Sequence, residues 1–292
     1  MLPIAIVLGL IFHNSISKFN SLTPWLIFVM LYLTLCSIDI KKMKITWLHL
    51  WVVLFQIGVS LGLYLILRPF NEILAQGALV IVLAPTATSA PVIAAMLGAN
   101  LSTMVTSTLL SNLAVAAVSP LYFSMAGNNV DMPFLQSSWM VLSKVIPVII
   151  IPLILALLTQ RFLPRMATAI AKQKDVSFYI WAFSLTIVMG CTIDSIFKMD
   201  SSEIEILIFM ALLSVSICTM QFAFGRWFGK RYGDIVAGGQ SLGQKNTILA
   251  IWMAQTYMTP LSSVIPALYV LWQNLFNSYQ IWHKVRFEKN RN

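Results

Sequence analysis

The sequence predicts an all-α integral membrane protein with ten transmembrane helices. Its 292 residues are 59% hydrophobic and only 10% charged, and the mean hydropathy is +0.83. A typical globular domain carries about 25% charged residues, and a soluble protein of this length could not cover its surface with so few charges. The composition therefore excludes soluble enzymes, disordered tails and disulfide scaffolds, and we expect one membrane domain over residues 1–292.

Apolar runs separated by charged or turn-forming residues define the ten helices. A transmembrane helix needs about 20 mostly apolar residues. The first run is short, but it lacks the basic flank and the A-x-A cleavage site of a signal peptide, so we expect it to be retained. The predicted helices cover residues 2–16, 24–38, 47–68, 72–97, 101–124, 138–162, 177–196, 203–227, 234–257 and 260–283.

Lysine and arginine residues predict the orientation of the chain. Fourteen of the 19 basic residues follow predicted helices 2, 6 and 8 or lie at the C-terminus, which places them on one side of the membrane. Acidic residues such as Asp131, Asp194 and Glu203 fall on the other side. Because basic loops mark the cytoplasmic side, we predict a multi-pass protein of the inner (plasma) membrane with both termini in the cytoplasm.

Predicted helices 4 and 9 are interrupted in the middle. Helix 4 contains Pro85 and Pro91, and each proline removes an intrahelical hydrogen bond and clashes with the preceding turn. Helix 9 contains three glycines between residues 238 and 243, with polar residues continuing to Thr247. Unwound backbone at this depth is tolerated only where protein or a water-filled cavity surrounds it.

The two interruptions lie five helices apart, so each half of the chain is interrupted in its fourth helix. Because five is odd, the halves must have opposite orientations in the membrane. The predicted inverted repeats cover roughly residues 1–125 and 136–283. Corresponding interruptions in inverted repeats indicate the central binding site of a secondary transporter.

Lys245 lies at the centre of predicted helix 9. A lysine at this depth costs about 2.5–3.5 kcal/mol on insertion scales and must find acceptors, since it is too deep to reach the interface. The candidates are the carbonyls of the broken helices, the neighbouring Ser241, Gln244 and Asn246, and the hydroxyls of helix 4. Two compatible roles remain: an internal counter-charge that holds the helices together, or a group that binds an anionic substrate or titrates during transport.

Acidic residues are absent from the middle of the predicted helices, since all ten fall at or near helix ends or in loops. This distribution disfavours an aspartate-pair proton antiporter and leaves no pair of carboxylates for acid–base catalysis. The three histidines also fall near the membrane interfaces. We therefore predict no enzyme activity, no catalytic residue, no metal site and no cofactor.

Other polar residues inside the predicted helices are candidates to line a substrate site. Ser and Thr hydroxyls usually bond to their own helix, whereas buried Gln and Asn amides need partners. The predicted substrate and crossing residues are Thr86, Thr88, Ser89, Thr108, Asn112, Ser241, Gln244, Lys245, Asn246, Thr247 and Asn274. Further candidates within the helices are Gln56, Ser107, Ser111, Gln273 and Asn277.

Three stretches, residues 85–120, 243–250 and 267–274, together resemble the bile acid:sodium symporter family. The resemblance implies ten helices in two inverted repeats, with helices 4 and 9 broken and crossing at mid-membrane, and a division into panel and core domains. It also implies transport of organic anions such as bile salts, pantoate and keto acids. We therefore expect a secondary transporter of small organic anions that works by alternating access.

The sodium sites that this resemblance implies are altered. The family motif E-x-G-x-Q-N corresponds to residues 241–246, so Ser241 replaces the glutamate and Lys245 replaces the glutamine. Ala90–Pro91 and Met104 replace further ligands, whereas Gln56 and Thr108 correspond to retained ones. Because a hard cation needs oxygen ligands, we expect the Lys245 ammonium to take the place of sodium. Facilitated diffusion, exchange and proton coupling all stay open.

Two alternatives are kept. One is a sodium-coupled organic anion symporter that retains a cation at altered positions including Gln56, Thr108 and Ser241. The other is a non-transporting receptor or scaffold of the same fold. The expected partners are a small organic anion and the lipid bilayer. Nucleic acid is not expected, because the basic residues punctuate apolar runs without forming a patch.

Overall fold

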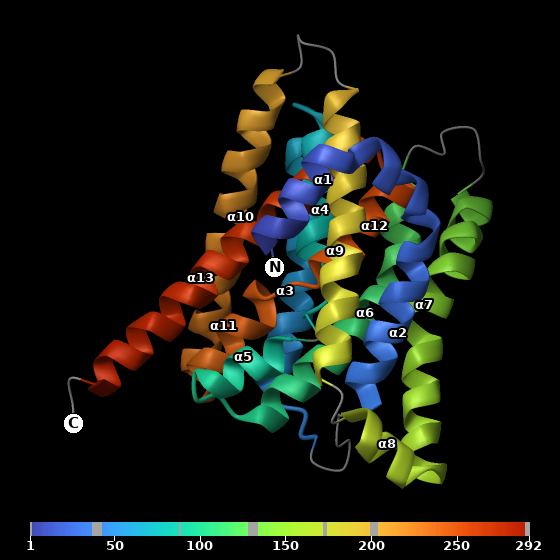
Figure 1. Ribbon diagram of the computed structural model, residues 1–292. Helices are drawn as coiled ribbons and strands as arrows, with labels where there is room; N and C mark the ends of the chain where they lie inside the picture. Colours follow the sequence, from blue (N-terminus) through green and yellow to red (C-terminus); the bar gives the residue numbers. More distant parts are fainter. Residues whose placement is uncertain are drawn as a thin grey trace. The chain divides into compact units, whose positions relative to one another are not determined.

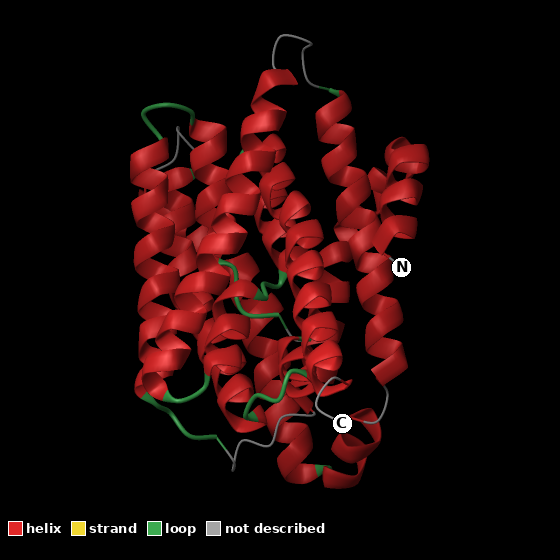
Figure 2. Ribbon diagram, turned by 90° about the vertical axis from the view of Figure 1, so that its left-hand side faces the viewer, coloured by secondary structure: helices red, strands yellow, loops and turns green. Residues whose placement is uncertain are grey.

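The structure is a computed structural model that describes residues 2–36, 43–87, 89–127, 134–171, 174–198 and 204–289. Over these residues the chain is almost entirely helical and forms no strand (Figures 1 and 2). The helices are α1 (Leu2–Ile16), η1 (Ser17–Leu22), α2 (Thr23–Cys36), α3 (Trp47–Leu67), α4 (Glu72–Leu83), α5 (Ala90–Met96), α6 (Leu101–Ala126), α7 (Phe134–Phe162), α8 (Pro164–Ala171), α9 (Lys174–Phe197), α10 (Ile204–Tyr232), α11 (Ile235–Gly243), α12 (Thr247–Tyr257), η4 (Pro260–Ser263) and α13 (Val264–Lys289).

Six helical stretches among the described residues are long and apolar enough to cross a membrane. Helices α4, α5, α11 and α12 are too short to be counted in this way, and α1, η1 and α2 contribute to one continuous stretch. The predicted count of ten transmembrane helices therefore stays a prediction. The six stretches are Val7–Cys36, Trp47–Leu67, Leu101–Ala126, Phe134–Phe162, Tyr179–Phe197 and Glu205–Tyr232.

The chain divides into two compact units, each assembled from three separate segments. Unit 1 consists of Met1–Ile40, Ala116–Ile206 and Ile248–Val264, and unit 2 consists of Lys41–Val115, Leu207–Thr247 and Ile265–Asn292. Both units therefore combine residues from the N-terminal and the C-terminal parts of the sequence.

In unit 1, helices α1 and α9 pack closely at two glycines. A Cβ atom on Gly9 would lie 3.3 Å from the main-chain nitrogen of Gly190. Near the ends of the same two helices, His13 Nδ1 lies 3.2 Å from Asp194 Oδ1, and Lys198 Nζ lies 2.6 Å from Asp194 Oδ2. The α1–α9 contact thus combines close main-chain packing with a polar cluster around Asp194.

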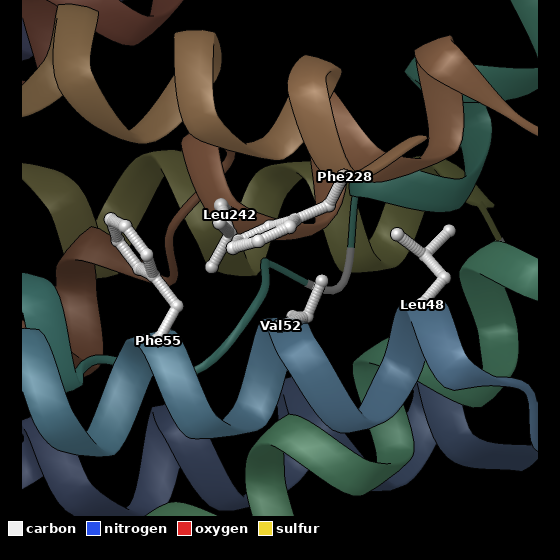
Figure 3. Close-up of a cluster of buried hydrophobic side chains, with 5 residues drawn as sticks. All are labelled: Leu48, Val52, Phe55, Phe228 and Leu242. Carbon is white, nitrogen blue, oxygen red and sulfur yellow. The ribbon is translucent and has the colours of Figure 1, made fainter. Parts of the chain in front are cut away.

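In unit 2, one face of α3 packs against α10 and α11. Leu48, Val52 and Phe55 are spaced by four and three residues, which places them on one face of a helix. They contact Phe228 of α10 and Leu242 of α11 in a buried hydrophobic cluster (Figure 3). This cluster positions α11 beside α3, close to the point where α11 ends.

Helices α10 and α11 approach each other through glycines. A Cβ atom on Gly225 would overlap the carbonyl oxygen of Gly238, and a Cβ atom on Gly238 would overlap that of Gly225. The turn between the helices contains Gly233 with φ +98°, and Asp234 then caps α11 by accepting a 2.8 Å hydrogen bond from the Ala237 N–H. Small residues thus allow α11 to lie directly against α10.

The two predicted interruptions are present in the structure. Helix α4 ends at Leu83 and α5 begins at Ala90, so the break includes Pro85. Helix α11 ends at Gly243 and the next helical residue is Thr247, so that break includes Lys245. Each break leaves main-chain carbonyls at the end of a helix without the N–H groups that a continuing helix would supply.

Candidate functional site

The two breaks pair with each other inside unit 2. The Ala87 N–H donates a 2.8 Å hydrogen bond to the Gln244 carbonyl, and the Asn246 N–H donates a 2.8 Å bond to the Pro85 carbonyl. Thr86 and Lys245 are thereby matched as an isolated antiparallel bridge. Two extended segments, each only a few residues long, therefore provide hydrogen-bond partners for part of each other's main chain.

The Lys245 side chain caps the end of α4. Its Nζ lies 2.9 Å from the Val82 carbonyl oxygen and 2.9 Å from that of Ala84. In a continuing helix the N–H groups four residues further on would bind these oxygens. The end of a helix also carries partial negative charge, so the ammonium is placed where a cation is most favourable.

Gln56 of α3 caps the same end of α4. Its Nε2 donates to the Leu83 carbonyl and, over 3.1 Å, to the Ala84 carbonyl. The Ser111 hydroxyl of α6 donates a 2.7 Å bond to Gln56 Oε1 and accepts a 3.0 Å bond from the Thr86 N–H. Ser111 therefore orients the Gln56 amide so that its NH2 group points at the carbonyls.

Lys245 is only 1% exposed. Among the described residues, no carboxylate forms an ion pair with it, and the one buried carboxylate is Asp194 of unit 1. The positive charge is therefore balanced by main-chain dipoles. The sequence predicts the broken-helix carbonyls among the acceptors, and two of them, those of Val82 and Ala84, are the ones Nζ contacts.

The end of α11 is capped by neutral groups from α13 and α10. The Tyr269 hydroxyl donates a 2.9 Å hydrogen bond to the Gly243 carbonyl, and Gln221 Nε2 donates to the Tyr269 oxygen over 3.1 Å. Gln273 Oε1 accepts a 3.0 Å bond from the Lys245 N–H. All three side chains are buried.

A row of amide side chains links α11 to α13. Gln240 Nε2 donates a 2.9 Å hydrogen bond to Asn277 Oδ1, and Asn277 Nδ2 donates to Gln244 Oε1. The predicted site residue Asn274 is not part of this row, because its Nδ2 bonds to the Val270 carbonyl of its own helix at 2.6 Å. The sequence singles out Gln244 and Asn277 as polar helix residues, but nothing in it predicts their pairing or the part that Gln240 takes.

Met104 occupies the region beside Ser241. The Ser241 hydroxyl donates to the Ala237 carbonyl at 2.7 Å and lies 3.6 Å from Met104 Sδ. Met104 is fully buried in a cluster with Ala87, Ala90, Ala94 and Ala237. An apolar side chain therefore fills the space next to the Ser241 hydroxyl.

Two predicted residues on α6 bond mainly within their own helix. The Thr108 hydroxyl donates a 2.9 Å bond to the Met104 carbonyl, and Asn112 Nδ2 donates a 2.8 Å bond to the Thr108 carbonyl. Asn112 Oδ1 is buried and has no hydrogen-bond partner. Neither side chain bonds to the paired breaks.

The remaining predicted residues differ in exposure. The Thr86 hydroxyl donates a 2.7 Å bond to the Ser241 carbonyl, which ties the first break to α11. Asn246 and Thr247 are buried at the second break, whereas Ser89 is exposed beside the start of α5. Thr88 lies outside the described residues.

The His13–Asp194–Lys198 cluster of unit 1 is a polar feature that the sequence does not reveal. His13 also stacks on Phe197, with 4.7 Å between ring centroids. The paired residues are 181 positions apart, and no local pattern marks them as neighbours. His49, in contrast, lies buried in unit 2 and bonds through Nε2 to the Thr103 carbonyl at 3.0 Å.

A metal site does not emerge from the described part of the chain, where no group of three or more His, Cys, Asp or Glu residues lies together. The three cysteines, Cys36, Cys191 and Cys218, are buried and form no disulfide. The polar groups at the paired breaks are amides, hydroxyls, carbonyls and one ammonium. These groups can bind or exclude ions and hydrogen-bond a solute.

Several helices able to cross a membrane and two interrupted helices paired at their breaks are typical of a membrane transporter. The chain belongs to the sodium bile acid symporter family, whose model matches residues 24–200, more than half of the chain. The match includes Gln56, the first break and Ser111, and it ends before Lys245. A comparison with curated proteins gives no match. The protein is thus a multi-pass membrane transporter of the bile acid:sodium symporter type.

Proposed function

We propose that the protein transports small organic anions by alternating access without sodium coupling, and that the Lys245 ammonium takes the place of a sodium ion. The observation that carries this proposal is the position of Nζ, 2.9 Å from the carbonyl oxygens of Val82 and Ala84. Main-chain carbonyls at a helix end are ligands that a sodium ion would use. Here a covalently attached cation contacts them.

The surroundings of Ser241 support the same proposal. A sodium ion needs several oxygen ligands, and near Ser241 the packed side chain is the thioether of Met104. Gln56, which the family resemblance assigns to a sodium site, directs its NH2 group at the Leu83 and Ala84 carbonyls. A donor in this position repels a cation.

The proposed substrate is a carboxylate or sulfonate of bile-acid-like or smaller size, bound near the paired breaks. The Lys245 ammonium is hydrogen-bonded to the end of α4, so it attracts the anion through its charge without contacting it. Neighbouring groups supply the hydrogen bonds to the anion. We assign this role to Ser89, Asn246 and Thr247, together with Thr86, Thr88, Thr108, Asn112, Ser241, Gln244 and Asn274 as the wider predicted set.

The proposed topology follows the sequence. The chain forms one transporter domain of ten transmembrane helices in two inverted repeats, roughly residues 1–125 and 136–283. Both termini lie in the cytoplasm, and the protein resides in the inner (plasma) membrane. Its function is transport, without catalysis.

The test is anion counterflow in proteoliposomes that contain the purified protein. Liposomes loaded with taurocholate, pantoate or pyruvate take up the labelled anion at equal rates in NaCl and in choline chloride if the proposal holds. Uptake only in NaCl would establish the sodium-coupled alternative. Absence of counterflow for every anion, despite a ligand-dependent thermal shift, would favour the receptor alternative.

A further inference from the structure

Helix α8 lies between two helices of unit 1 that are able to cross a membrane. The stretch Phe134–Phe162 of α7 ends two residues before α8, and the next such stretch, within α9, begins at Tyr179. Helix α8, Pro164–Ala171, therefore follows one such stretch and precedes the next (Figure 1). A helix of eight residues is too short to cross a bilayer.

Contacts within unit 1 hold α8 in place. Ala167 is only 6% exposed, and its N–H donates a 3.0 Å bond to the Leu163 carbonyl. Gln160, one turn before α8, donates from Nε2 to the carbonyls of Leu35 and Cys36 at the end of α2, over 2.9 and 3.1 Å. Helix α8 itself packs against both α2 and α7.

The outer side of this segment combines apolar and basic side chains. Phe162, Leu163 and Met166 are 68%, 53% and 44% exposed. Arg161 and Arg165 are exposed beside them, and the Arg161 guanidinium carbon lies 6.0 Å from the centre of the Phe162 ring.

Acidic residues are absent from the sequence between positions 132 and 174, whereas Lys172 and Lys174 add two more basic residues directly after α8. Asp175 follows Lys174 and offsets one of the four basic charges, so the segment keeps a net positive charge. This charge is complementary to an anionic surface.

We propose that the end of α7 and α8 form a binding surface for anionic phospholipids. Arg161 and Arg165 bind the lipid phosphate, for which the planar guanidinium is well suited because it can donate two parallel hydrogen bonds. Phe162, Leu163 and Met166 enter the acyl region next to the headgroup, as the apolar faces of interfacial helices do. The proposal is independent of substrate and coupling.

The experiment is native mass spectrometry of the purified protein titrated with phosphatidylglycerol or phosphatidylcholine. Each arginine near an anionic membrane surface contributes a factor of about five in affinity. Arg165→Gln is therefore expected to bind phosphatidylglycerol about fivefold more weakly, and Arg161→Gln/Arg165→Gln about 25-fold more weakly, with phosphatidylcholine binding unchanged. The matched control is Arg68→Gln, which removes an exposed arginine of unit 2.

Three results would overturn the proposal. The first is wild-type phosphatidylglycerol affinity in the double variant, and the second is an equal loss in Arg68→Gln. The third is displacement of the lipid by inorganic phosphate at millimolar concentration, which would show that a free anion is the ligand. A loss of affinity for both lipids in Phe162→Ser would support the acyl contact.

Discussion

The two broken helices of unit 2 end in different ways. At the end of α4, three successive carbonyls receive hydrogen bonds from an ammonium and an amide, supplied by Lys245 and Gln56. At the end of α11, the Gly243 carbonyl receives one bond from the neutral Tyr269 hydroxyl. In both cases a break leaves helix-end carbonyls without main-chain partners. A charged group binds them at the end of α4, and a neutral group binds them at the end of α11.

This difference shows that the first break depends on the second. Lys245 lies in the break after α11, but its side chain serves the end of α4. The end of α11 depends on residues of α10 and α13, such as Gln221 and Tyr269. Removing the Lys245 charge should therefore destabilise the end of α4 most. Removing the Tyr269 hydroxyl should destabilise the end of α11 alone.

The largest effect is expected for Lys245→Met, which shortens the side chain by one atom and removes its donors. The carbonyls of Val82 and Ala84 then lose a buried partner, and the free energy of unfolding should fall by about 3 kcal/mol. The measurement is the unfolding midpoint in detergent. Lys284→Met is the control, since Lys284 Nζ bonds to the Met96 carbonyl at an exposed position. An equal loss of unfolding free energy in both variants would contradict the special role of the buried charge.

A second change should convert the charged cap into an ion site. Ser241→Glu/Lys245→Gln introduces the residues that the family resemblance implies at both positions, and sodium should then stabilise the protein by about 2.7 kcal/mol at 100 times its Kd. Thermal midpoints in NaCl and choline chloride measure this gain, and the wild type should show none. A double variant indifferent to sodium would leave the replacement of sodium by Lys245 without support.

A smaller effect is expected for Tyr269→Phe at the end of α11. The change removes the hydroxyl that bonds to the Gly243 carbonyl and accepts from Gln221, which should lower the free energy of unfolding by about 1.5 kcal/mol. Tyr279→Phe, at a residue that is 62% exposed, should leave it unchanged. If Tyr269→Phe destabilised as much as Lys245→Met, the contrast between the two helix ends would be wrong.

The smallest effect is expected for Ser111→Ala, which removes the hydroxyl between Thr86 and Gln56. The Gln56 amide loses the group that orients it, and we expect a loss of about 1 kcal/mol. Ser216→Ala is the control, because its exposed hydroxyl bonds to the Leu212 carbonyl of its own helix. In the double variant Ser111→Ala/Lys245→Met the losses should not add, since both act on the α4 end.

Both breaks were predictable from local sequence, because proline and clustered glycines act on their own helix. Pro85 cannot donate to the preceding turn, and the glycines before Lys245 allow α11 to end and to lie against α10. The need of Lys245 for main-chain acceptors followed from its depth alone. These properties do not depend on distant parts of the chain.

The partners that close the site were not predictable. Nothing in the sequence distinguishes Tyr269 from an ordinary core residue. Only the packing of α13 on α11 reveals that its hydroxyl bonds to the Gly243 carbonyl. The position of Met104 beside Ser241 and the pairing of His13 with Asp194 also arise from segments far apart in the sequence. Such contacts are set by tertiary structure, for which a single sequence carries no periodic signal.

The covalent link between the ammonium of Lys245 and the chain has a thermodynamic consequence. A bound ion can drive transport because it binds at one chemical potential and is released at another. A charge attached to the chain has no concentration on either side, so a difference in chemical potential can act through Lys245 only if its proton exchanges. A transporter whose cation is part of its own chain can bring its substrate to electrochemical equilibrium through this site, and any accumulation beyond that point requires a second solute.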